Sequence, residues 1–184
     1  MSDFAKLLEA EIPRLRRYAR ALTRGDFARA DDLVQSCLVR AVAKQHLWEP
    51  ASDLRAWLFT ILHNQFVNDV RRSAREATQV DIEEVATKLT TKSNAIPSLE
   101  LRDLELAINR LPHEHRQIIL LVGLEGMGYT EAAAILQIPI GTVRSRLSRG
   151  RDQLRRLMGM EEHLTPQKLA EGARDRGEEC PRAA

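Results

Sequence analysis

The stretch that decides the fold is residues 138–154, which read IPIGTVRSRLSRGRDQL. It holds four arginines and three hydroxyl side chains, with no lysine and a single acid. On a helical wheel of about 100° per residue that starts at Val143, the side chains of Leu147, Leu154 and Leu157 cluster within about 40°. The arginines and serines fall on the far side and the flanks. This pattern predicts a helix whose leucines pack on its own domain while its arginines face outward.

A second, shorter helix is expected directly before this stretch. Residues 131–136 read EAAAIL, a helix-forming run with Thr130 as its expected cap, and residues 137–139 then form a turn. A short helix, a turn of roughly three or four residues and a further helix make a helix-turn-helix, which is a DNA-binding unit. Guanidinium groups match phosphates and the guanine edge, and hydroxyls bond to either. The alternative is a solvated basic helix.

The composition of the 184 residues favours an all-helical protein. Hydrophobic residues make up 43% of the chain, while aromatic residues make up only 4%. Alanine, leucine, arginine and glutamate dominate, and these are good helix formers. The net charge is only +2, so the basic character is local. Residues 141–156 hold six arginines and one acid, whereas residues 99–140 hold three arginines and six acids.

Two further amphipathic helices are expected nearer the N-terminus. Residues 30–44 read ADDLVQSCLVRAVAK, with apolar side chains at helical spacing and two acids in the expected first turn. Residues 54–72 read LRAWLFTILHNQFVNDVRR and also follow a helical period. Their exposed stripe is polar but mostly uncharged, which is unusual for a merely solvated face. That stripe consists of Thr60, Asn64, Asn68 and Arg71.

These patterns divide the chain into two small helical domains joined by a flexible linker. A helix is expected to begin at Ile12-Pro13, after a shorter one from Phe4 to Ala10. The helical period is lost where serine, threonine, acids and a proline prevail. The expected units are a first domain over 1–72, a linker over 73–98, a helix-turn-helix domain over 99–158 and a disordered tail over 159–184.

Several classes of chemistry lack their sequence signatures. The two cysteines, Cys37 and Cys180, form no metal-binding spacing, and no glycine-rich phosphate loop or pair of nucleophile and base is present. We therefore expect no metal, no cofactor and no enzymatic activity. The longest apolar run, residues 118–122, is far shorter than the roughly 20 residues of a membrane span. No signal peptide is recognised, so we expect a cytoplasmic protein.

Taken in order, three segments resemble an extracytoplasmic-function (ECF) sigma factor, a member of the sigma-70 family of bacterial RNA polymerase initiation factors. Residues 30–44 resemble the region-two helix that docks on the polymerase. Residues 53–72 resemble the segment that reads and opens the downstream promoter element. Residues 111–157 resemble region four, whose helix-turn-helix binds the upstream element. The resemblance implies a factor that binds core RNA polymerase and directs promoter recognition and transcription initiation.

The resemblance also implies a role for particular residues, at positions that match the family's motifs. The polymerase contact would involve Asp31, Asp32, Leu33, Gln35 and Arg40. The downstream element would be held by the loop 46–53 and by Trp57, Asn64, Asn68, Arg71 and Arg72. The upstream duplex would be held by Thr142, Arg144, Ser145, Arg146, Ser148 and Arg149.

Details of region four and the overall length are similar to the general-stress-response branch of alphaproteobacteria. In that branch a small anti-sigma protein holds the factor inactive, so an anti-sigma partner is expected here as well. One departure is the Gln35-Ser36-Cys37 sequence, which lies where the family often has an acid after the glutamine. The alternative function is a stand-alone helix-turn-helix regulator, which would bind duplex DNA tightly without polymerase.

Overall fold

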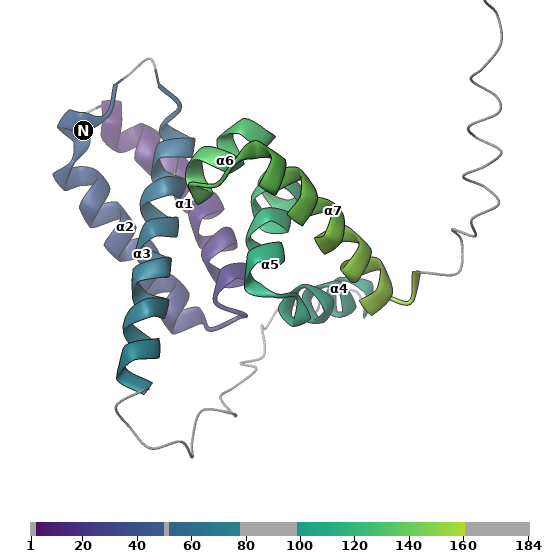
Figure 1. Cartoon of the computed structure of the whole chain (residues 1–184). Coiled ribbons are helices and arrows are strands. Elements are labelled where there is room, and N and C mark those ends of the chain that lie inside the picture. Colours follow the sequence, from purple (N-terminus) through teal and green to yellow (C-terminus); the bar gives the residue numbers. More distant parts are fainter. Residues whose placement is uncertain (1–2, 50–51, 78–98, 161–184) are drawn as a thin grey trace, which may run out of the picture.

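The computed structural model describes residues 3–49, 52–77 and 99–160. Over these residues every regular element is helical, which confirms the all-helical prediction. The elements are α1 (Asp3–Leu22), α2 (Phe27–Ala43), η1 (Gln45–Leu47), α3 (Leu54–Ala77), α4 (Leu99–Arg110), α5 (His113–Ile119), η2 (Leu120–Leu124), α6 (Tyr129–Leu136) and α7 (Ile140–Leu157). Figure 1 shows α1 to α3 on one side of the molecule and α4 to α7 on the other. We call residues 3–77 the first half and residues 99–160 the second half.

The first half is a bundle of three long helices around an apolar core. Leu15 and Tyr18 of α1, Leu33 of α2 and Phe59 of α3 are buried in it. The Tyr18 and Phe59 rings lie 5.1 Å apart between centroids. The sharp turn between α1 and α2 uses two residues with positive φ, one of which is a glycine at φ +82°. These contacts fix α3, so that one of its faces remains outside the bundle.

Three details at helix ends differ from the sequence predictions. The helix α1 runs without interruption through Pro13, where we predicted a new helix. Phe4, in the first turn of this helix, packs against Trp48 at a centroid distance of 5.5 Å. The N-cap of α2 is Asp26, whose carboxylate accepts from the Arg29 N–H at 3.0 Å, so the acids at 31 and 32 lie beyond the first turn.

The third difference is at the start of α6. The prediction that Thr130 caps this helix is wrong, because the helix begins two residues earlier than predicted, at Tyr129, and its N-cap is Gly128. The Gly128 N–H donates to the Glu131 carboxylate at 2.6 Å. Gln137 has φ 54° and turns the chain from α6 into α7, which confirms the predicted turn.

The second half contains the predicted helix-turn-helix, made of α6 and α7. Val143 and Leu147 of α7 are buried, as the helical wheel indicated. Gly150 also lies in this contact, and a Cβ built there would be 3.0 Å from the Cδ1 atom of Ile119. A glycine is therefore what lets α7 approach α5 closely.

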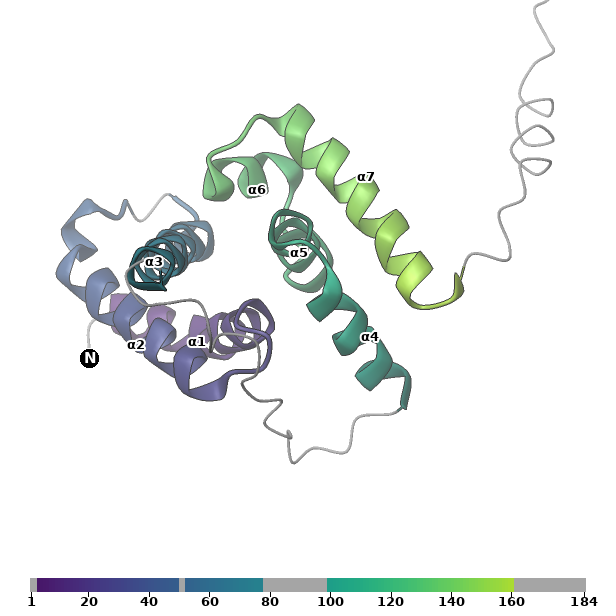
Figure 2. The ribbon, with the colours of Figure 1, turned by 60° about the horizontal axis from the view of Figure 1, so that its bottom comes forward.

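The two halves are packed against each other. Figure 2 shows α5 between the bundle of α1 to α3 and the helix α7. The His113 ring of α5 stacks on the Phe66 ring of α3 at a centroid distance of 5.3 Å. The helix α3 continues through residues 73–77, which we had predicted to belong to the linker. The rest of the predicted linker and residues 161–184 of the predicted tail lie outside the described residues.

Candidate nucleic-acid interface

The outward face of α7 carries most of the predicted duplex contacts. Arg144, Ser145, Ser148 and Arg149 are exposed, and Thr142 is half-buried at the start of the helix. The buried residues of α7 lie on its other side, so this row of side chains is held on a firmly packed helix. The surface is therefore a rigid row of hydrogen-bond donors with fixed positive charge, which suits a duplex with phosphates on both sides of a groove.

Arg146 lies differently from the other arginines of this set. Its Nη2 atom is 2.7 Å from a carboxylate oxygen of Glu114 on α5, and its side chain is 29% exposed. In the structure this ion pair ties α7 to α5. The other predicted arginines of α7, Arg144 and Arg149, have no such ion pair among the described residues and stay exposed.

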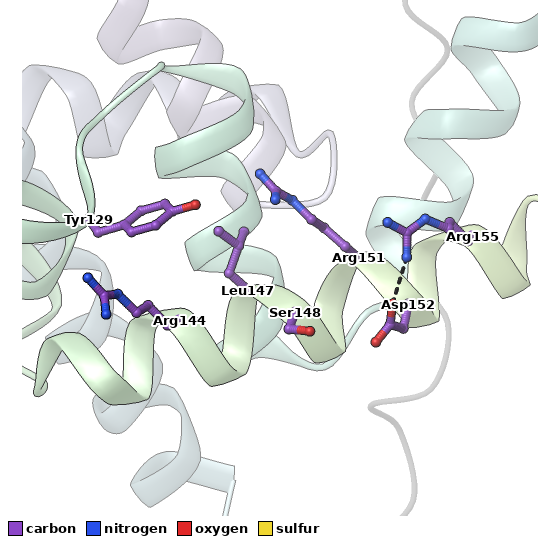
Figure 3. Close-up of a pocket in the computed structure, with 7 residues that line it drawn as sticks. All are labelled: Tyr129, Arg144, Leu147, Ser148, Arg151, Asp152 and Arg155. Carbon is purple, nitrogen blue, oxygen red and sulfur yellow. Dashed lines mark hydrogen bonds and ion pairs between the residues drawn. The ribbon is translucent and has the colours of Figure 1, made fainter. Parts of the chain in front are cut away.

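A shallow pocket of about 250 Å³ lies beside this row, and the sequence analysis did not assign it. Figure 3 shows Tyr129 of α6 and the side chains of Arg144 and Arg151 of α7 around it. Asp152 and Arg155 also line this pocket, and the Arg155 Nη1 atom donates to the Asp152 carboxylate at 2.6 Å. A phenol beside two guanidinium groups forms a surface that suits a phosphate.

The polar stripe of α3 also lies on the surface. Asn68, Arg71 and Arg72 are exposed and Asn64 is half-buried. Trp57 is half-buried at the other end of the stripe, where Phe4 meets it edge-on at 6.5 Å between centroids. The stripe thus offers amide groups, an indole and two guanidinium groups along one face of one helix. Such groups suit unpaired bases better than a closed duplex.

The outer face of α2 presents three of the five residues predicted to contact polymerase. Asp32, Gln35 and Arg40 are exposed. Asp31 is half-buried and lies 3.8 Å from the Arg16 guanidinium of α1. Leu33 is only 4% exposed and belongs to the core. In this arrangement Leu33 packs α2 on the core, and three side chains remain exposed on its outer face.

The one cysteine in the described part of the chain is structural. Cys37 is fully buried, and its Sγ lies 3.5 Å from the Leu58 carbonyl oxygen. Burial raises the pKa of the Cys37 thiol to about 12, so the thiol stays protonated and unreactive. Cys180 lies outside the described residues. No helix in the described ranges has the length and apolar character of a membrane span.

Comparison with known proteins identifies the two halves. Residues 8–63 match the family described as the sigma-2 domain of PhyR, and residues 101–154 match the family described as sigma-70, region 4. The chain is similar to the ECF RNA polymerase sigma factor EcfG of Rhodopseudomonas palustris, with 40% identity over 149 residues that cover 81% of each chain.

Comparison with solved structures also gives sigma factors. The sigma factor RpoE of Bartonella quintana, solved with the anti-sigma factor NepR, superposes with a TM-score of 0.74 at 39% identity, over 88% of this chain and 100% of that one. CnrH, solved with the cytosolic domain of CnrY, superposes with a TM-score of 0.62 at 27% identity, over 86% and 89% of the two chains.

A sigma-2 domain followed by region four defines an initiation factor of the sigma-70 class. Within that class, the chain belongs to the ECF RNA polymerase sigma factors. As a member of this family it binds core RNA polymerase and promoter DNA, and it directs promoter recognition and transcription initiation.

The residues that the sequence analysis missed lie in the pocket beside α7. Arg151 is on the same flank of the helical wheel as Arg144, so the spacing of seven residues was a usable signal for it. Tyr129 comes from a different helix, and only the packing of α6 on α7 brings it there.

Proposed function

We propose that this sigma factor reads the upstream promoter element with α7, holds the melted downstream element on α3 and docks on core polymerase with α2. The observation that carries the proposal is the exposed arginine and hydroxyl row of α7. The same chain has two further exposed polar faces, on α2 and α3. A regulator that only binds duplex DNA requires one such face, not three.

On α7 we assign base reading and phosphate binding to different side chains. Arg149, Ser145 and Ser148 face directly outward and reach base edges in the groove. Arg144, Arg151 and Tyr129 line the pocket and hold a backbone phosphate. Thr142 contributes a hydroxyl near the start of the helix, and Arg146 positions α7 through Glu114 while its remaining donors reach the duplex.

On α3 we assign the amides of Asn64 and Asn68 to the exposed edges of unpaired bases. Trp57 supplies a ring on which a base stacks, and Arg71 and Arg72 bind the backbone of the melted strand. On α2, Asp32, Gln35 and Arg40 contact polymerase directly, while Asp31 and Leu33 support that face from beneath.

We assign an anti-sigma factor to the groove between α1 and α4. This groove has a volume of about 690 Å³ and a largely apolar lining that includes Leu101, Leu104 and Ile108. Arg16 and Arg20 lie at its edge, which suits an amphipathic helix with acidic flanks. The similar RpoE was solved with NepR, so NepR of Bartonella quintana is a suitable probe. Replacing Leu104 with Asp is expected to abolish its binding while core polymerase binding is retained.

The factor works in the cytoplasm, has no catalytic chemistry of its own and serves a general stress response. The EcfG and RpoE relatives support this branch. The test of the function is run-off transcription with core polymerase, together with a DNA shift assay with and without polymerase. We expect promoter-dependent transcripts and weak duplex binding by the free factor. Tight duplex binding without polymerase would instead support a stand-alone regulator.

Three substitutions test the residue assignments. Arg149→Ala is expected to weaken use of the upstream element by about 1–3 kcal/mol and to change base preference at one position. Arg151→Ala is its matched control, since loss of a phosphate contact weakens all sequences alike and reduces the salt dependence.

Asp32→Arg is expected to weaken polymerase binding without lowering the melting temperature. Unchanged polymerase affinity for Asp32→Arg would remove Asp32 from the docking face.

A further inference from the structure

Four of the five buried polar side chains in the described part of the chain contact the other half, and the fifth is Gln65. His63 of α3, Arg116 and Gln117 of α5 and Glu125 after η2 are all less than 8% exposed. The Gln117 Nε2 atom lies 3.5 Å from His63 Nδ1, across the junction. Buried apolar side chains of both halves form one continuous cluster around these groups. The junction therefore adds buried charged and polar side chains to an apolar contact.

A single carboxylate of the second half binds two helices of the first half. The Arg17 guanidinium of α1 donates to both Glu125 carboxylate oxygens, at 2.9 Å each, with the fork geometry that makes such pairs strong. The Arg55 guanidinium of α3 lies 3.7 Å from the same carboxylate and also donates to the Glu125 backbone carbonyl. The Glu125 side chain is fully buried and the Arg17 side chain is 51% exposed, so solvent screens this pair only in part.

The charges around this carboxylate are only partly satisfied. Arg116 is 3% exposed and donates to the Leu22 carbonyl at 3.3 Å, but its Nε and Nη1 atoms have no hydrogen-bond partner among the described residues. The Tyr18 hydroxyl and the Arg55 Nε atom are also buried without a partner there. Burial lowers the pKa of the Arg116 guanidinium to about 10, which reflects the cost of removing this charge from water.

These features suit a contact that forms and separates. Buried charges with incomplete partners destabilise a permanent interface, and water satisfies the same groups when the interface opens. Contacts between domains that move are more polar than permanent ones for this reason. The connection over residues 78–98 spans about 70 Å when fully extended, so the covalent chain permits wide separation.

We propose that this junction is a latch. The two halves exchange between the closed arrangement of the structure and an open one, and Glu125, bound by Arg17 and Arg55, sets the balance. In the closed state α6 and η2 lie against α3 and α1, which fixes the two promoter-reading helices relative to each other. If polymerase engages the open state, which rests on the proposed function, the closed fraction lowers the apparent affinity for polymerase in proportion.

The test is a distance measurement in the full chain. Spin labels are placed on cysteines that replace Glu9 of α1 and Met160 after α7, both exposed. Cys180 is changed to serine, and Cys37 is left in place because it is buried. The variant is Glu125→Gln, which removes the charge and keeps the shape. The control is Glu100→Gln, the same change at an exposed position of α4.

Pulsed electron spin resonance is expected to give one narrow distance distribution for the parent and for Glu100→Gln. Glu125→Gln is expected to raise the population at other distances about tenfold, because charged hydrogen bonds of this kind typically contribute at least that factor. Arg17→Gln, on a half-exposed side chain of α1, is expected to give the same shift. If the Glu125 variant misfolds, the Arg17 variant still tests the proposal. Distributions that superpose for all variants would overturn the latch.

Binding to core polymerase separates this inference from the proposed function. The two latch variants are expected to bind more tightly than Glu100→Gln, and both lack a substitution in the proposed docking face. If they open without gaining affinity, closing does not compete with polymerase, and that part of the inference is wrong. Absence of polymerase binding by every protein, the parent included, would overturn the proposed function and leave the distance result intact.

Discussion

The second half of this sigma factor makes two contacts of opposite character. Within the half, α5 meets α7 through apolar groups, and Gly150 approaches Ile119 closely. Towards the first half, the same α5 and the residues after η2 present Arg116 and Glu125, which are buried and charged. The polar pairs of the α5–α7 contact, Arg146 with Glu114 and His115 with Gln153, are exposed or half-buried, whereas the charged groups towards the first half are buried.

This difference indicates that the α5–α7 contact is permanent and that the contact between the two halves can open. Apolar burial favours association without a competing demand for solvation, so α7 stays on α5 whatever the protein binds. A buried charge cluster is stable only when its geometry is complete, so a modest perturbation changes the balance between closed and open. Substitutions on the two contacts should therefore affect different observables, namely global unfolding for the first and interdomain distance for the second.

The largest effect is expected from breaking the apolar contact. Gly150→Leu places a side chain where a Cβ alone would lie 3.0 Å from Ile119 and 3.2 Å from the His115 Cβ. We expect the free energy of unfolding of the second half to fall by about 2–3 kcal/mol, as overpacked cores do. Chemical denaturation followed by circular dichroism measures it. Gly141→Leu is the control, because a Cβ there meets nothing within 4 Å. Equal stabilities would show that α5 and α7 are not closely packed.

A smaller effect of opposite sign is expected at the charged contact. Arg116→Met replaces a buried and incompletely paired guanidinium with an apolar side chain of similar length. We expect the closed state to become more stable by about 1–2 kcal/mol, as with other replaced buried ions. Narrower spin-label distributions and a higher melting temperature would register it, with Arg102→Met on the exposed face of α4 as control. A loss of stability would mean that the bond to the Leu22 carbonyl outweighs desolvation.

Acidification should open the junction without affecting the apolar contact. Burial, and then the neighbouring His113, lower the pKa of His63 from 6.5 to about 4. The pKa of His113 is lowered by its burial and by Arg116 and Arg24, against the opposing charge of Glu114. Protonation therefore disfavours closing, so the closed state is fully favoured above pH 6.5 and loses stability as the pH falls from there toward 4.

For His63 alone, the open-to-closed ratio should rise about tenfold between pH 7.5 and pH 5.5, which is about 1.3 kcal/mol. Spin-label distances at the two pH values measure this ratio. His63→Gln is expected to flatten the dependence, while His46→Gln, at an exposed position of η1, should leave it unchanged. A parent protein whose distances do not change with pH would show that His63 remains buried when the halves separate.

Much of the fold was predictable because helical periodicity is a local property. The leucine row of α7 and the apolar faces of α2 and α3 repeat every three or four residues, and burial follows that repeat. Helix ends were predicted less well. The helix α1 continues through Pro13, and its first turn packs Phe4 against Trp48, a distant contact that no local signal contains.

The site was predictable where it lies on one helix and not where it joins two. The arginine row of α7 was visible as a charge pattern, whereas Tyr129 joins Arg151 only after α6 packs on α7. The latch could not be predicted from the sequence for the same reason. Glu125 lies in a glycine-rich turn that resembles an ordinary surface loop, and its partner Arg17 lies 108 positions earlier in the chain.

The smallest effect is expected at an ion pair that lacks burial. The Arg146 and Glu114 side chains are 2.7 Å apart, closer than Arg17 and Glu125, but 29% and 61% exposed. Solvent screens such a pair, so Glu114→Ala should cost less than about 0.5 kcal/mol of folding stability and should leave the interdomain distances unchanged. Chemical denaturation and the same spin labels measure both quantities. If Glu114→Ala lowered the folding stability as much as Glu125→Gln does, the distance between the charges, and not their burial, would decide the strength of these pairs. The distinction drawn here between the two contacts would then be wrong.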